Sequence, residues 1–254
     1  MEAEIRPART EWRILRGWTD EELRDRLTRL ASVERNFPEH PDSLRADDVW
    51  RFYRSHAQVG IEPPGPPVPN GPFERMVPAL AAYRFSDPDI VKGHFDPDTP
   101  LLGRRMLLEL KPLFLHYLCG TIVGAVREES DDERTVWGYR YETLVGHVET
   151  GAEWFLLEKN HRTGVISFSI EAHWKPGQFP NWWSYVGFKL LAPRYQRRWH
   201  RNAQRRLSAI GAGAWPSEPT VSHGSAGTLR HEGADLEMRG GESIPLKRTS
   251  EETG

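Results

Sequence analysis

The sequence has very little cysteine and no long hydrophobic run. Cys119 is the single cysteine among 254 residues, which excludes an internal disulfide and a cysteine-rich metal site. No apolar stretch reaches the roughly 20 residues that a transmembrane helix needs. The first residues also lack the apolar segment of a secretion signal. These absences predict a cytoplasmic globular protein without stable membrane insertion.

Net charge is close to zero as well. The chain has 34 Lys and Arg residues against 36 Asp and Glu residues, a formal charge of −2. Such a balance provides no long-range field that would select nucleic acid. The phosphate-binding loop, the GxGxxG turn after a strand and the GxSxG elbow are all absent. The sequence therefore predicts neither a nucleic-acid partner nor a cofactor.

The first third of the chain mixes short elements with a proline-rich segment. Leucines at helical spacing predict a helix over 20–32, and Thr19 with Glu22 forms the pattern of a capping box. We expect extended segments at 11–18 and 48–58. The proline-rich segment 62–72 should form a rigid surface connection, and a short helix should follow at 73–83.

The middle of the chain changes to a period of two. Ile166, Phe168 and Ile170 alternate with serines, which is typical of a strand with one buried face. Gly120 and Gly124 interrupt a long apolar stretch and favour a bent, buried strand over a helix. We expect an antiparallel meander of about five strands over 104–174.

The last regular element is a long helix over 181–209, in which Pro193 should produce a kink or an interruption. Its apolar stripe recurs at every fourth position, at Trp183, Gly187, Leu191, Tyr195 and Trp199. Beyond it the chain is rich in Gly, Ser, Pro and Glu. We therefore expect a flexible N-terminus at 1–10, one domain at 11–209 and a disordered tail at 210–254.

This order of elements predicts an α+β helix-grip fold, in which a curved antiparallel sheet wraps around a long C-terminal helix. A lone sheet exposes an apolar concave face that must be covered, and the long helix with its aromatic stripe is suited to cover it. A cavity between sheet and helix would have the usual composition of a small-molecule site, apolar with a few polar groups. The ten tryptophans suit the walls of such a cavity.

Four segments carry a resemblance to a known family: WRILRGWTDEEL, GPFERMVPALAAYRFSDP, YETLVGHVETGAEWF and APRYQRRWHRNAQRRL. Over roughly 11–208 the chain resembles the domain-of-unknown-function family 1990, also called UPF0548. That family looks related to the Bet v 1-like, START-type (SRPBCC) superfamily of lipid and small-ligand binders. The resemblance implies the helix-grip fold and, because the family has no established general activity, implies no reaction.

A polar cluster around 139–153 is the main candidate for chemistry. If the strand is uninterrupted, His147, Glu149 and Glu153 share one face, and a turn near Gly146 brings Tyr141 close to His147. A bulge at Gly151 would separate Glu153 from the others. Tyr141, His147 and Glu149 are the candidate acid–base groups. The alternative is an ordinary hairpin in which these groups satisfy the backbone or each other.

The favoured function is a binder that holds an apolar or amphipathic small molecule between sheet and helix. The residues expected to line its cavity are Leu108, Leu110, Tyr141, His147, Trp154, Phe168, Trp183 and Leu191. Two alternatives stay open: a cofactor-free cyclase, dehydratase or hydrolase on the same scaffold, and a regulatory module that uses the basic helix or the tail. A homodimer through the adjacent tryptophans that begin the helix is also left open.

The remaining reactive residues have structural interpretations. Cys119 lies in an apolar strand and is expected to be a buried, inert thiol. His94, His116, His147 and His173 lack metal-ligand spacing, so no metal site is expected. The arginines of the last helix could meet an anionic partner, but with so little net charge they are better interpreted as a solvated face.

Overall fold

One antiparallel sheet organises the protein. The computed structural model describes residues 10–214, and within them eight strands join in the order β2-β8-β7-β6-β5-β4-β3, while β1 pairs with β5. The strands are β1 Glu11–Ile14, β2 Arg51–Ile61, β3 Val91–His94, β4 Arg105–Leu110, β5 Leu115–Ser130, β6 Arg134–Thr143, β7 Glu149–Asn160 and β8 Val165–Pro176.

Three α-helices and one short 3₁₀ helix accompany the sheet. They are α1 Asp20–Leu30, the 3₁₀ helix Pro41–Ser43, α2 Pro72–Ala81 and α3 Trp182–Gly211. The capping box that begins α1 is confirmed, because the Thr19 side chain accepts from the Glu22 backbone and the Glu22 carboxylate accepts from the Thr19 backbone. None of the helices in residues 10–214 is long and apolar enough to cross a membrane.

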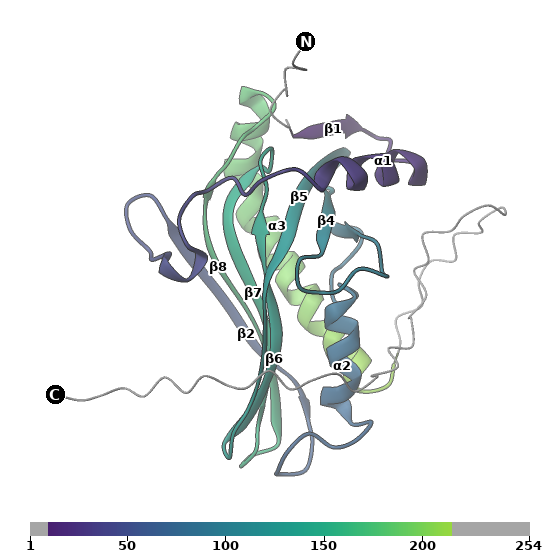
Figure 1. Ribbon diagram of the computed structural model, residues 1–254, viewed down its shortest axis with the longest axis vertical. Helices are drawn as coiled ribbons and strands as arrows, with labels where there is room; N and C mark the ends of the chain where they lie inside the picture. Colours follow the sequence, from purple (N-terminus) through teal and green to yellow (C-terminus); the bar gives the residue numbers. More distant parts are fainter. Residues whose placement is uncertain (1–9, 215–254) are drawn as a thin grey trace.

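The sheet curves around α3, so the helix-grip fold is confirmed. Figure 1 shows α3 running diagonally along one face of the long strands, with α2 beside its C-terminal half. The core fills the space between them, and Phe85, Phe155, Phe168 and Trp199 form a chain of aromatic contacts with ring centroids 5.0 to 6.2 Å apart. The opposite face near β4 and β5 is covered by α1, through Leu23 and Leu30.

The expected meander is present, and its strands begin and end within a few residues of the predicted positions. β3 was not predicted, because its four residues are flanked by Asp and Pro and show no periodicity. Pro193 does not interrupt α3, which is continuous from Trp182 to Gly211, and the alternative expectation of a kink stays a prediction. A proline removes one backbone hydrogen bond, and here Leu191 and Tyr195 pack toward the sheet on either side of it.

The proline-rich connection is anchored by a buried ion pair. Lys159 of β7 is fully buried and places its Nζ 2.7 Å from Oε2 of Glu62. The same carboxylate accepts the backbone N–H groups of Val68 and Phe73 at 3.0 and 2.8 Å. The segment is therefore fixed to the sheet at both ends.

Two expected segments fall mostly outside the described residues. Of the predicted flexible N-terminus, the structure describes only Thr10, which is buried and donates to the carbonyl of Gln178 at 3.0 Å. Of the predicted tail, it describes 210–214, and α3 continues to Gly211.

Candidate functional site

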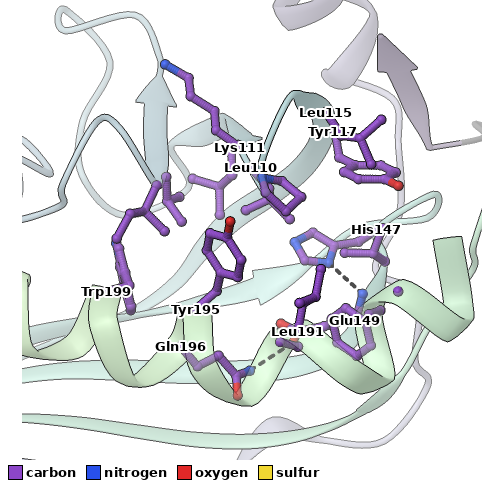
Figure 2. Close-up of a pocket in the computed structure, with 18 of the residues that line it drawn as sticks. Leu110, Lys111, Leu115, Tyr117, His147, Glu149, Leu191, Tyr195, Gln196 and Trp199 are labelled. Carbon is purple, nitrogen blue, oxygen red and sulfur yellow. Dashed lines mark hydrogen bonds between the residues drawn. The ribbon is translucent and has the colours of Figure 1, made fainter. Parts of the chain in front are cut away.

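A cavity of about 200 Å³ lies between the sheet and the N-terminal half of α3. Its walls come from β4, the start of β5, the end of β6, the start of β7 and α3, as Figure 2 shows for the labelled side chains. The helix stripe expected from the sequence faces this cavity, at Trp183, Gly187, Leu191, Tyr195 and Trp199.

One part of the cavity is apolar. Leu108 and Leu110 reach it from β4, whereas Leu107, the residue before Leu108, points to the opposite face and packs under α1. Leu191 of α3 lies across from them. Trp183 lines the mouth and packs edge to face on Trp12 with ring centroids 5.1 Å apart.

Six of the eight expected lining residues therefore surround the cavity: Leu108, Leu110, Tyr141, His147, Trp183 and Leu191. Trp154 does not, because its neighbour Glu153 faces the cavity and consecutive residues of a strand face opposite sides. Its ring lies instead beneath the guanidinium of Arg140, 5.2 Å from the ring centroid.

Phe168 is on the expected face of β8 but not at the cavity. It is fully buried in the core, with its ring centroid 5.5 Å from that of Phe85. The segment that follows α2 fills the space in front of it. The expectation that Phe168 touches a ligand in this cavity is therefore wrong.

His147 presents an unused hydrogen-bond donor to the cavity. It lies in the turn between β6 and β7 and is 3% exposed. Its Nδ1 accepts the backbone N–H of Glu149 at 2.9 Å, so the ring proton of the neutral imidazole is on Nε2. Burial lowers the pKa of His147 to about 4, which keeps the ring neutral at pH 7. Nε2 has no hydrogen-bond partner within residues 10–214, and Figure 2 shows it pointing away from Glu149 into the cavity.

Two carboxyl groups form a polar end of the cavity. Glu149 accepts from the Gln196 amide at 3.2 Å, and Glu153 accepts from the Tyr141 hydroxyl. Burial raises the pKa of Glu149 to about 7 and that of Glu153 to about 8. A smaller hollow of about 30 Å³ shares these four residues and His200 with the main cavity.

The polar side chains come together because β7 is an uninterrupted strand, as the first of the two sequence alternatives required. Tyr141 pairs directly with Glu153, and the pairing of β7 with β8 continues without a shift through Gly151. The bulge considered from the sequence is absent at that position. Glu149 and Glu153 consequently face the same cavity.

The proposed acid–base trio is close in space but not joined as a catalytic unit. His147 meets the backbone of Glu149 rather than its carboxylate, and Tyr141 donates to Glu153 rather than pointing freely at a substrate. A pKa of about 4 also makes His147 a weak base at neutral pH. The catalytic roles of Tyr141, His147 and Glu149 remain predictions.

Three polar residues of the site were not selected from the sequence. Glu153 was recognised in the polar cluster, but it was not chosen as a site residue because a bulge at Gly151 would have turned it to the other face of the strand. Gln196 and His200 follow the aromatic stripe by one position and carry no signal of their own. His200 bonds Ser55 through Nδ1 at 2.7 Å, and burial lowers its pKa to about 4.

His94 and His116 lie away from the polar end. His94 and His116 both bond the carboxylate of Glu109, at 3.2 and 2.7 Å, on the face covered by the N-terminal segment. In the described part of the chain no group of three or more His, Cys, Asp or Glu residues could hold a metal ion. Cys119 is buried, as expected, and burial raises its pKa to about 12.

The cationic residues of α3 are exposed. The exposed side chains on the outer face of the helix include Arg194, Arg197, Arg198, Arg201 and Arg205. At the start of the helix Trp182 is 77% exposed, whereas its neighbour Trp183 faces the cavity.

Comparison with protein-family models gives one match, which spans residues 39–206 and therefore most of the domain. The chain belongs to the family of the domain of unknown function DUF1990. A sequence search of curated proteins finds no match. The family that the sequence resembled is thus confirmed, and all the residues that line the cavity lie within the DUF1990 segment.

Solved structures that are similar to this DUF1990 protein match it at low sequence identity and with low TM-scores. Ara h 8.0201 is 7% identical with a TM-score of 0.38, covering 65% of this chain and 99% of its own. The hypothetical protein jhp0584 from Helicobacter pylori is 13% identical with a TM-score of 0.38, covering 70% and 96%. Human STARD10 is 10% identical with a TM-score of 0.34, covering 75% and 81%.

Proposed function

We propose that this protein binds a small amphipathic molecule in the cavity between β4, β7 and α3. The observation that carries the proposal is the Nε2–H of His147, a buried donor without a partner in residues 10–214, at the border between the apolar wall and the carboxyl groups. An unpaired buried donor costs about 1–3 kcal/mol, and a ligand acceptor atom would recover that cost.

The cavity volume limits the buried part of the ligand. An apolar cavity of about 150 Å³ can hold a benzene ring. At about 200 Å³, this one suits a buried group of roughly eight to ten non-hydrogen atoms. Trp183 at the mouth is partly exposed, so a longer chain could extend past it. 1-Octanol is therefore a suitable probe, with an apolar chain and a hydroxyl that can accept from His147.

Binding is expected to be modest. An octyl chain buries about eight CH₂ or CH₃ groups worth roughly 0.8 kcal/mol each, a gross gain near 6 kcal/mol. Lost translational and rotational freedom offsets part of this gain. We expect dissociation constants from about 0.1 millimolar to about one millimolar for the probe.

An enzyme on the same scaffold is favoured less. Its strongest support is Glu149, because a cavity carboxyl with a pKa of about 7 suits acid–base chemistry near neutral pH. The base first expected, His147, does not suit that role. A binding site needs only the cavity and its oriented polar groups, so it requires fewer assumptions.

A matched pair of variants tests the proposal. Leu191 lines the cavity, whereas its neighbour Leu190 is 74% exposed on the outer side of the same helix. We expect Leu191→Trp to fill the cavity and to weaken 1-octanol binding, measured by calorimetry, at least tenfold. Leu190→Trp should leave it within twofold of the unmodified protein. The proposal fails if 1-octanol does not bind, or if both variants bind it equally well.

Native mass spectrometry of the gently purified protein provides a second readout. A retained small molecule in the unmodified protein and in Leu190→Trp, but not in Leu191→Trp, would support the cavity as the binding site. The same retained molecule in both variants would contradict it.

A further inference from the structure

Among the residues that the structure describes, the polar end of the cavity has two acidic groups and no neighbouring cation. Glu149 and Glu153 lie on the same face of β7, four residues apart, and both are half-buried. Their partners are the neutral amide of Gln196 and the phenol of Tyr141. In residues 10–214 no Lys or Arg side chain stabilises the charge of either carboxylate.

The titratable groups that face these carboxyls from other elements are neutral at pH 7. Burial raises the pKa values of the tyrosines and of Cys119, and it lowers the pKa values of the histidines. Each shift favours the uncharged form of the group at pH 7. The groups are Tyr83 from the segment after α2, Cys119 from β5, Tyr139 and Tyr141 from β6, His147 from the turn, His173 from β8 and His200 from α3.

The nearest cations serve other groups. Lys111 lines the cavity with its aliphatic stem, but Figure 2 shows its ammonium pointing away from the cavity centre. That ammonium lies 3.7 Å from the carboxylate of Glu109. The guanidinium of Arg104 donates to the backbone carbonyls of Ala81 and Thr99.

Two carboxyls in a cavity without a cation are costly to ionise. Burying a carboxylate is unfavourable unless a positive charge or several donors compensate for the lost water. The raised pKa values of about 7 and 8 are consistent with that missing partner. An amphipathic ligand could supply it.

We propose, building on the proposed function, that the ligand carries a protonated amine that binds between Glu149 and Glu153 and a hydrogen-bond acceptor that meets His147. An ammonium group has three donors and matches carboxylate oxygens. An ammonium cannot bond the Nε2–H of His147, because both are donors. The Nε2–H therefore donates to a hydroxyl or carbonyl oxygen elsewhere on the same ligand. A fatty acid is disfavoured, because its carboxylate would add a third negative group.

The proposal fixes the direction of a pH dependence. Binding an ammonium favours the ionised carboxylates, so each bound amine releases up to one proton per carboxyl at pH 6. The affinity for the amine then rises with pH, by up to about tenfold per pH unit for each proton released, and levels off above pH 8. An alkylamine itself stays protonated up to about pH 10. An alcohol carries no charge and should show little of this dependence.

The experiment compares three probes of one chain length: octylamine, 1-octanol and octanoate. Each is titrated by calorimetry against the full chain at pH 6, 7 and 8. We expect octylamine to bind at least tenfold more tightly at pH 8 than at pH 6. At pH 8 it should also bind at least tenfold more tightly than 1-octanol, and octanoate should bind weakest.

Substitutions identify the groups responsible. The double variant Glu149→Gln with Glu153→Gln should lose the preference for octylamine over 1-octanol and the pH dependence of octylamine binding. The control Glu158→Gln, on the same strand but paired with Arg134 at 3.1 Å near the surface, should behave as the unmodified protein. Circular dichroism checks that each variant is folded, and the pH profile of the unmodified protein tests the proposal even if the double variant is not.

The outcomes separate the two proposals. If 1-octanol binds but octylamine has no advantage at any pH, the amine proposal is overturned while the cavity remains a binding site. If none of the three probes binds, the proposed function itself fails. An octylamine preference that survives the double substitution would also overturn the amine proposal.

Discussion

Replacing Glu153 by Gln should stabilise the protein at alkaline pH and leave it nearly unchanged at acid pH. In the folded protein the pKa of Glu153 rises from its ordinary value of 4.5 to about 8, because the carboxyl is buried. The folded state therefore binds more protons than the unfolded chain between these values. The stability present below pH 4.5 is consequently lost as the pH rises toward 8.

The size of this effect follows from the pKa values. Each pKa unit corresponds to about 1.36 kcal/mol, so Glu153 alone would remove at most roughly 3 kcal/mol between pH 5 and pH 8. Because the carboxyl is partly open to the cavity, solvent reduces the penalty, and we expect about 1–3 kcal/mol. A Gln at this position keeps an oxygen that can accept from Tyr141 but has no charge to bury.

Urea denaturation between pH 5 and pH 8.5 measures this directly. The free energy of unfolding of the unmodified protein should fall over this range, and that of Glu153→Gln should fall less. Glu158→Gln is the matched control, since this carboxyl lies on the same strand near the surface, paired with Arg134. If Glu153→Gln and the unmodified protein show the same pH slope, Glu153 is not held in the protonated form, and the reasoning about the polar end is wrong.

Two further expectations concern the scaffold and the far face of the sheet. Lys159→Met should cost about 3–5 kcal/mol in urea denaturation, because it leaves the Glu62 carboxylate buried without its cation; a loss under 1 kcal/mol would contradict the role given to this pair. Trp154→Phe should leave 1-octanol affinity within twofold, because the ring packs on Arg140 away from the cavity; a tenfold loss would show that the cavity has been assigned to the wrong face.

Much of the fold could be predicted because local patterns determine it. The alternation in β8 and the stripe that places Leu191 and Tyr195 toward the sheet both follow from side-chain periodicity. The capping box of α1 needs only two residues, Thr19 and Glu22. β3 was missed because a four-residue edge strand forms through its pairing with β4, which leaves no periodic signal in its own sequence.

The site was less predictable, because it depends on which face of a strand each side chain occupies and on how far along the strand the cavity extends. Trp154 was assigned to the wrong face of β7, because a shift of one residue along a strand moves a side chain to the opposite face. Phe168 was placed on the correct face, but periodicity does not tell how far along a strand the cavity extends. That extent depends on where the segment with Phe85 inserts.

The hydrogen-bond partner of His147 also depended on tertiary geometry. The sequence left open whether His147 meets a carboxylate or the backbone, and the turn brings the backbone N–H of Glu149 to Nδ1 and leaves Nε2 without a partner in residues 10–214. The shape of that turn depends on its packing. Thr10 and Gln178, distant in sequence, both contact it.

The most direct test of the central claim is a crystal structure of the full chain grown with 1-octanol. We expect the alkyl chain between Leu108, Leu110 and Leu191, with the hydroxyl oxygen within hydrogen-bond distance of Nε2 of His147. An empty cavity, or octanol bound only on the outer surface, would contradict the account.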